Sequence, residues 1–406
     1  MKKLLAVGIF GLLMLSSCSQ QDSPSLPDEV PQGEVSENLL PLKEAVEIAN
    51  DFINGISGDA TRADRQPVSV EMYADNTTRS EDEDALLGYY VMNFGNEEGF
   101  AIVSADRRHG PMYAFSDEGS LHVSDTTDNP GLRYYMLSLP GGGYNPGDLI
   151  GPGGPGIPIP DPLIKPIFEV EVAPLLHANV RKWGQEYPFD KYCSNGHVGC
   201  VPMSAGMIMS YFEWPTSYGG YTFNWTAMKN DFFNDTLARF LRMLGQSNNL
   251  NAHYENEDYT YVFDEEFNRN YTRTFDNFGY KNIKIQNFTE TTARAAIKGS
   301  NGNSPIIITG KNKDRTKPGH AWVLDGIYHV RTIPSSAVVE PGDNKKYDEF
   351  YCFHCVWGWF GRNNGYFRFV NGTVKGEPYH TESGETSTAL KETYNGLVIY
   401  SDFVKK

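Results

Sequence analysis

The sequence predicts an α+β fold for the larger of two compact units. In that unit a helical pattern comes early, at Cys200–Phe212, and apolar strands come late, near residues 304–310 and 320–326. A segment dense in glycine and proline separates the two units. With 406 residues and 40% hydrophobic residues, the chain is long enough for two domains that each have a core.

The first 17 residues have the pattern of an export signal. A basic start, Met1–Lys3, precedes an apolar stretch at residues 4–15 that is too short to span a bilayer. Leu15–Cys18 resembles a bacterial lipobox, so acylated Cys18 is predicted to anchor the exported protein to a bacterial membrane or the cell surface. The alternative is a plain secretory signal with an incidental cysteine. Neither reading identifies the membrane face.

Residues 18–38 are polar and contain several prolines, which is typical of a tether. A small unit at residues 39–138 follows. Helical periodicity at residues 42–56 and a hairpin formed by residues 89–94 and 99–104 predict that it is also α+β. This unit contains no recognisable catalytic grouping.

Residues 139–166 form the segment rich in glycine and proline. Such a composition does not build a packed element, and proteases cut exposed segments of this kind. We therefore expect maturation by cleavage in this linker, which releases a domain at residues 167–406.

Cys200 is the first candidate catalytic residue. Pro202 fits the first turn of a helix, and Val201, Ala205, Ile208 and Phe212 recur at helical spacing. Cys200 is therefore expected at the N-terminal end of the helix, where unpaired N–H groups and the helix dipole stabilise a thiolate. The alternative is a buried, inert cysteine.

His320 is the second candidate. It stands between Gly319 and Ala321, at the start of a predicted strand, and these small neighbours leave room for another group to approach the ring. An imidazole there could take a thiol proton and later protonate a leaving amine. The alternative is a partly exposed histidine in a hairpin.

Several ordered blocks resemble the streptopain family of papain-like cysteine peptidases, from about Phe168 to the end of the chain. Taken together they are more specific than any one of them. The blocks are Trp183-Gly184-Gln185, Pro188-Phe189-Asp190, Gly199-Cys200-Val201, Gly319-His320-Ala321, Asp325-Gly326, Trp357-Gly358-Trp359 and Gly365-Tyr366-Phe367-Arg368.

The resemblance implies a papain-like catalytic domain, in which a helix carrying the nucleophile packs on an antiparallel sheet carrying the histidine. It makes Cys200 the nucleophile, His320 its base and Gln185 a side-chain donor to the oxyanion hole. Trp357 would shield the histidine. Taken alone, Gln185 is an ordinary surface glutamine, and Trp357 and Trp359 are core residues that alternate along a strand.

The block from Gly99 to Asp106 resembles the prodomain of streptopain-like zymogens. The resemblance implies that residues 39–138 inhibit their own catalytic domain, which would cleave extended protein or peptide substrates. The alternative is a mature accessory or binding domain.

Two departures from the family pattern leave a second function open. Val356 stands where relatives commonly have Asn, and Pro202 and Met203 replace a small residue and Thr. The first hypothesis is an exported cysteine endopeptidase, made as a zymogen, that acts through a Cys–His dyad and a thioester acyl-enzyme. The second is a catalytically impaired relative that acts as a surface binding or inhibitory protein.

Charge and cysteine spacing argue against other classes of protein. A formal net charge of −16 disfavours nucleic acid as a partner. Cys352 and Cys355 flank His354, but strand alternation sends the two thiols to opposite faces, and zinc needs further ligands. We expect neither a metal nor a cofactor.

Overall fold

The computed structural model describes residues 39–57, 65–73, 88–95, 97–107, 111–122, 129–136, 139, 167–256, 259–263, 266–300, 302–310, 319–332, 348–369 and 397–406. The predicted export signal, Cys18, the tether and residues 140–166 of the linker lie outside these ranges. Within them, no helix is both long enough and apolar enough to cross a membrane.

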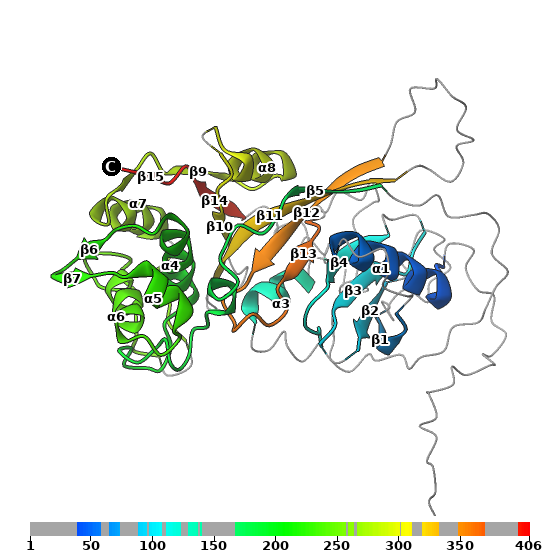
Figure 1. The fold of residues 1–406 in the computed structure, drawn as a ribbon, viewed down its shortest axis with the longest axis horizontal. Helices are drawn as coiled ribbons and strands as arrows, with labels where there is room; N and C mark the ends of the chain where they lie inside the picture. The colour runs from blue at the N-terminus through cyan, green and yellow to red at the C-terminus, as the bar shows by residue number, and fades with distance from the viewer. Residues whose placement is uncertain are drawn as a thin grey trace, which may run out of the picture.

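Strands of both units join in one antiparallel sheet (Figure 1). Its members are β1 (Pro67–Tyr73), β2 (Tyr89–Phe94), β3 (Phe100–Ser104), β4 (Met112–Ser116), β5 (Ile167–Val172), β9 (Lys284–Asn287), β10 (Ile306–Gly310), β11 (His320–Thr332), β12 (Asp348–Val356), β13 (Gly365–Phe367) and β14 (Val398–Ser401). Their order is β1-β2-β3-β4-β13-β12-β11-β10-β14-β9, and β5 pairs with β11. The units meet where β4 pairs with β13, with Phe115 opposite Tyr366 and Ala114 opposite Phe367.

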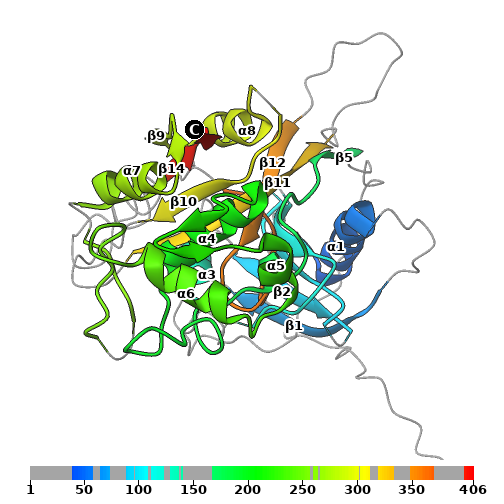
Figure 2. The ribbon, with the colours of Figure 1, turned by 60° about the vertical axis from the view of Figure 1, so that its left-hand side comes forward.

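Helices cover this sheet at both ends (Figures 1 and 2). They are α1 (Leu42–Ser57), α3 (Pro130–Met136), α4 (Cys200–Phe212), α5 (Trp225–Asn230), α6 (Asp235–Leu244), α7 (Phe267–Asn277) and α8 (Glu290–Lys298). The group α4 to α7 lies at one end and α1 at the other, while α3 lies between them. Short pairs, β6 (Ser217–Tyr218) with β7 (Tyr221–Thr222) and β8 (Tyr280–Lys281) with β15 (Val404–Lys405), complete the described elements.

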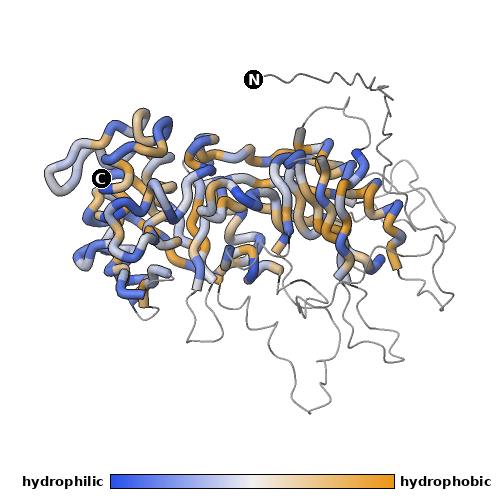
Figure 3. The backbone as a smooth tube through the Cα atoms, turned by 90° about the horizontal axis from the view of Figure 1, so that it is seen from below, coloured by the Kyte–Doolittle hydropathy of each residue, from blue (hydrophilic) through white to orange (hydrophobic). Residues whose placement is uncertain are grey.

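The neighbouring strands β10 and β11 carry apolar side chains on both faces, and the apolar segments run through the middle of the molecule (Figure 3). Ile307 and Val323 face α4, while Ile308, Trp322 and Leu324 face the opposite core with α8. The helix α4 is apolar all round because it too is enclosed, with residues 201–210 all buried. A rigid buried helix therefore carries Cys200.

The N-terminal unit shares its core with the larger unit. Phe52 of α1 packs edge-on against Phe168 of β5 at a centroid distance of 4.8 Å, and Phe115 of β4 lies 5.3 Å from Tyr328 of β11. On the opposite face, Tyr135 of α3 contacts Phe367 at 4.8 Å. Burial of apolar area on both faces holds the units together.

The α+β class predicted from the sequence is confirmed, and the predicted helices and strands are present with small shifts at their ends. The nucleophile helix begins at Cys200 and ends at Phe212, and the strand predicted at residues 304–310 begins at Ile306. One prediction was wrong: Trp357 and Trp359 do not alternate along a strand. β12 ends at Val356, because Gly358 adopts a φ of +79°, which an extended strand does not accommodate.

The buried carboxylate of Asp325 fixes the segment that follows β5, where the chain enters the larger unit. Asp325, at the bulge of β11, is fully buried; its Oδ1 lies 2.6 Å from His354 Nδ1, and its Oδ2 accepts the Leu176 N–H at 2.9 Å. We expect Asp325→Ala to lower the free energy of unfolding by about 3 kcal/mol, because it leaves a buried donor and a buried ring without a partner.

Thermal and urea unfolding of the full chain measure this loss. The matched control is Asp276→Ala, which removes a carboxylate that is 64% exposed and should change stability by less than about 0.5 kcal/mol. Equal stability of the two variants would contradict the role of Asp325.

Candidate active site

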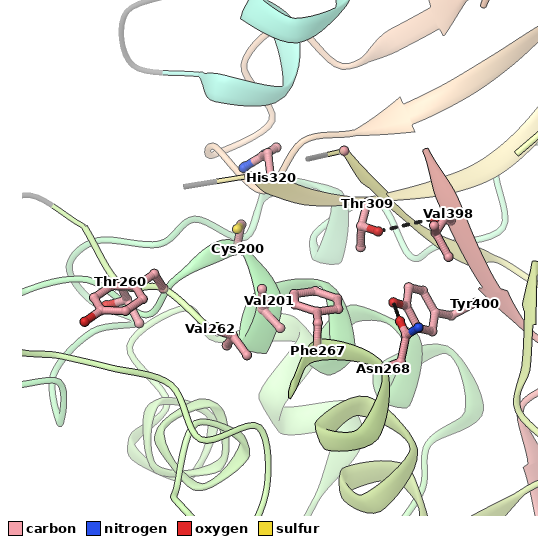
Figure 4. Close-up of a pocket in the computed structure, with 13 residues that line it drawn as sticks. Cys200, Val201, Thr260, Val262, Phe267, Asn268, Thr309, His320, Val398 and Tyr400 are labelled. Atoms are coloured by element: carbon pink, nitrogen blue, oxygen red, sulfur yellow. Dashed lines mark hydrogen bonds between the residues drawn. The ribbon is translucent and has the colours of Figure 1, made fainter. Parts of the chain in front are cut away.

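Cys200 and His320 line one pocket between α4 and the start of β11 (Figure 4). They come from segments far apart in the sequence, and the packing of α4 on β10 and β11 brings them together. The other lining residues are Val201, Thr260, Tyr261, Val262, Phe267, Asn268, Thr309, Gly310, Gly319, Val398 and Tyr400. The structure thus places both predicted catalytic residues in the same cavity.

Cys200 is the first residue of α4 and is partly exposed. Gly199 before it has a φ of +89°, and a β-carbon there would lie 2.9 Å from Thr260, so glycine permits both the turn and the close approach. Burial raises the pKa of the Cys200 thiol to about 11, while backbone N–H groups of Ala321, Cys200 and Val201 oppose the rise. The thiol therefore lies beside the backbone of the residue that follows His320.

The His320 ring lies on the face of β11 that also carries Trp322. It is buried, its centroid lies 5.9 Å from that of the Trp322 ring with an interplanar angle of 17°, and it lies beside Trp357, since both side chains meet Gly131. Burial lowers the pKa of His320 to about 4, and the nearby backbone of Trp357 opposes the shift. Its Nε2 makes no hydrogen bond, and no hydrogen bond joins it to Cys200, within the residues that the structure describes. Near pH 7 both groups are therefore neutral.

Helix α3 of the N-terminal unit presses on this histidine. A β-carbon at Gly131 would lie 2.6 Å from His320 Cδ2 and 2.5 Å from Trp357 Cε3, so the backbone of α3 rests directly on both rings. Asn129 caps the helix by accepting the Leu132 N–H at 3.1 Å. This contact could not be predicted from the sequence, because a glycine in a short helix has no pattern that marks a binding surface.

Gln185 lies beside the first turn of α4, outside the pocket lining. A β-carbon on Gly358 would lie 3.8 Å from Gln185 Nε2 and 3.2 Å from Met203 Cγ, which places all three together. The Gln185 side chain is 5% exposed, and its Nε2 makes no hydrogen bond within the described ranges. A buried donor without a partner at this point could bind an oxygen that enters the site.

Trp357 is fully buried beneath His320. Its Nε1 donates to the Asn363 carbonyl at 2.9 Å, and its ring lies 5.2 Å from Trp322. Val356 points to the opposite face, into the core around α4. The Val356 side chain therefore faces away from the His320 ring, which lies beside Trp357.

A pair of hydroxyl groups supports the first turn of the nucleophile helix α4. This pair was not predicted from the sequence. The Ser204 hydroxyl donates to the Val201 carbonyl at 3.0 Å and lies 2.9 Å from the Tyr271 hydroxyl, which also reaches that carbonyl at 3.3 Å. Tyr271 is fully buried. No local pattern in the sequence pairs α7 with the first turn of α4.

Cys352 and Cys355 lie in different cores, on opposite faces of β12, as strand alternation predicts. Within the described ranges, no three potential ligand side chains gather to hold a metal ion.

Comparison with known proteins assigns this region. The model of the peptidase C10 family matches residues 183–367, which include Gln185, Cys200, His320 and Trp357. Residues 183–367 are therefore similar to members of the peptidase C10 family. This is the streptopain family expected from the sequence. Ahead of this C10 region, the model of the Spi protease inhibitor matches residues 33–138.

The sequence identity to the individual proteins that the chain resembles is low. The chain is 24% identical over 367 residues to the thiol protease/hemagglutinin PrtT of Porphyromonas gingivalis, and the alignment covers 78% of this chain but 38% of that protein. The chain thus spans well under half the length of this relative. Among solved structures, a fragment of Prevotella intermedia prointerpain A aligns with a TM-score of 0.45 at 16% identity, over 78% of this chain and 96% of that one. Active wild-type interpain A aligns with a TM-score of 0.36 at 15% identity, over 60% and 98%.

The free amide of Gln185 yields a prediction. If it binds the oxyanion, Gln185→Ala should lower kcat of the processed enzyme by about 10²–10³-fold with a smaller change in KM, because the charge on that oxygen develops in the transition state. Initial rates on a peptide substrate measure both constants. Gln246→Ala, at an exposed position, is the control, and a loss confined to KM would argue against the oxyanion role.

Proposed function

We propose that this protein is a cysteine endopeptidase made as a zymogen, with Cys200 as nucleophile and His320 as general base and acid. The observation that supports this most directly is the position of the Cys200 thiol beside the backbone of Ala321, in a pocket that His320 also lines. Thiol and imidazole groups are the two that acyl transfer by a cysteine enzyme requires.

The proposed reaction proceeds in two steps. The Cys200 proton passes to His320, the thiolate attacks the scissile carbonyl carbon, and Gln185 Nε2 with the Cys200 N–H stabilises the resulting oxyanion. The C–N bond then breaks, His320 protonates the leaving amine, and a thioester to Cys200 remains. Water, deprotonated by His320, hydrolyses the thioester and returns the thiol.

The described state is the latent one in this proposal. The N-terminal unit acts as an intramolecular inhibitor, because α3 holds the His320 ring against Trp357 while burial keeps both reacting groups neutral. Cleavage between residues 139 and 166 would separate the units. β5 begins at Ile167 and pairs with β11, so a cut before Ile167 leaves that strand in the mature domain.

The location of the protein is part of the same proposal. The signal at residues 1–17 would direct export, and Cys18 would carry the lipid that anchors the chain to a membrane or the cell surface. Cleavage in the linker would free the catalytic domain from that anchor. Incorporation of labelled palmitate by the wild type and not by Cys18→Ala would support the anchor, and secretion without lipid would refute it.

Labelling with an epoxide inhibitor of papain-like enzymes tests the catalytic proposal. We expect slow labelling of the intact chain and rapid labelling of Cys200 after the linker is cut and the N-terminal unit is removed. The processed protein should also cleave casein. A folded, processed protein that takes no label and cleaves nothing would favour the alternative of a surface binding or inhibitory protein.

A further inference from the structure

Two large aromatic side chains stand out from the surface next to the segment that carries Gln185. Tyr187 is 68% exposed and Phe233 is 70% exposed, and their rings meet edge to face at a centroid distance of 6.0 Å. Exposed aromatic rings that gather at one place on a surface commonly mark a contact site. We call Tyr187 and Phe233 the aromatic shelf.

Ion pairs and hydrogen bonds hold the two loops beneath the aromatic shelf in place. Asp235 accepts from Lys191 at 2.6 Å, from the Tyr192 hydroxyl, and from Arg239 at 2.7 Å, which ties residues 186–192 to the start of α6. The Phe233 N–H donates to Asp231 Oδ1 at 2.9 Å. The backbone of the two loops that carry the shelf is therefore held in place.

The core below the shelf connects it to the loop that follows β12. Phe189 packs against Phe232 at 5.8 Å and Phe360 at 5.9 Å, and the Phe360 N–H donates to the Trp183 carbonyl at 3.1 Å. Tyr187 is two residues after Gln185, so their Cα atoms are at most about 7 Å apart. The shelf thus adjoins the oxyanion donor.

The pocket beside Cys200 is separate from the aromatic shelf. Its lining comes from residues near 200, 260, 267, 310, 320 and 398, and includes none from residues 183–192 or 231–235. An extended peptide bound at Cys200 has an acyl part before the scissile bond and a leaving-group part after it, which we call its two arms. One arm can place a side chain in the pocket, while the other runs past Gln185.

The position of His320 determines which arm of the bound peptide reaches the aromatic shelf. In the proposed reaction His320 gives its proton to the leaving amine, and its ring lies beside Trp357, since both rings meet Gly131. The loop from Trp357 continues past Gly358, beside Gln185, to Phe360 below the shelf. The leaving-group arm therefore lies on the same side as the shelf.

We propose that the aromatic shelf binds the part of a peptide substrate that follows the scissile bond, and that it favours an apolar or aromatic side chain two to four residues beyond it. This inference rests on the proposed function. It assigns Tyr187 and Phe233 as specificity-determining residues for the leaving group.

Two matched substrates test the aromatic shelf in the enzyme obtained by processing the full-length chain, with active sites counted by epoxide titration. Both share one acyl sequence; one ends in a small fluorogenic amine, and the other continues for four residues that include Leu and Phe. We expect Tyr187→Ala and Phe233→Ala each to lower kcat/KM about tenfold on the long substrate, through KM, and less than about twofold on the short one.

The control variant is Tyr221→Ala, which removes a ring that is 40% exposed and lies outside the shelf; it should change neither substrate. Unchanged kcat/KM on the long substrate, or an equal loss on both, overturns the shelf while the wild type remains an active peptidase. A wild type that takes no epoxide and cleaves neither substrate overturns the proposed function, and the shelf with it.

Discussion

Cys200→Ala is expected to abolish proteolysis, with a loss of at least about 10⁴-fold in kcat on casein or on a peptide substrate. The reason is that Cys200 carries the only thiol among the described residues that line the pocket, and the thiol is the group that forms the acyl-enzyme in the proposed reaction. Mass spectrometry of the epoxide-treated protein should show the label on Cys200 in the wild type and no label in the variant. The fold should be unchanged.

Cys193→Ala is the matched control for this experiment. Cys193 is also partly buried and free, but burial raises the pKa of its thiol to about 12, and it does not line the pocket. This control should retain full labelling and full activity. Residual proteolysis by Cys200→Ala, or loss of activity in Cys193→Ala, would show that the nucleophile is misassigned.

Gly131→Ala is expected to release the zymogen from latency without any cut. The new β-carbon would lie 2.5 Å from Trp357 and 2.6 Å from His320, closer than atoms pack, so α3 must move off the histidine. Overpacking of this kind costs about 1–3 kcal/mol, which corresponds to roughly five- to 150-fold more of the open form. Epoxide labelling of the uncleaved chain should therefore accelerate by about tenfold or more.

The pH dependence of labelling gives a second readout. With a thiol pKa of about 11, roughly one Cys200 in 10⁴ is ionised at pH 7 in the latent form, so labelling should rise with pH through the neutral range. In Gly131→Ala the thiol can pair with a freed imidazole, and the rate should level off at lower pH.

Arg133→Ala is the control on the same helix, because Arg133 is exposed on α3. It should leave latency and the pH profile unchanged. Alanine is a better helix former than glycine, so faster labelling of Gly131→Ala would come from the clash and not from melting of α3. If Gly131→Ala labels as slowly as the wild type, α3 does not maintain latency.

Local patterns predicted much of the structure that carries the site. Helical spacing after Pro202 located the first residue of α4 correctly, and the apolar run before Gly310 located β10. The same reasoning failed at Trp357, where aromatic alternation suggested a strand. The positive φ of Gly358 depends on its close packing against Met203 and Gln185, which no short-range pattern contains.

The arrangement of the two units could not be predicted in the same way. Sequence patterns identified a small α+β unit before a linker, but not that β4 would pair with β13 or that Gly131 would touch His320. Such contacts join residues far apart in the chain, and their energy comes from apolar surface that becomes buried only when both partners are folded. The hydrogen bond from the Tyr271 hydroxyl to the Val201 carbonyl could not be predicted for the same reason.

The sequence alone determined which groups are available for chemistry and which local element carries each. Cys200 begins a helix because Pro202 and the apolar spacing after it favour no other structure, and His320 begins a strand between two small residues. The folded chain determined what these groups do in the described state. Packing of α3 over His320 buries the ring, and burial makes the charged forms of both His320 and Cys200 unfavourable. Ionisation depends on the surroundings of a group in space, and these are set by contacts across the whole chain.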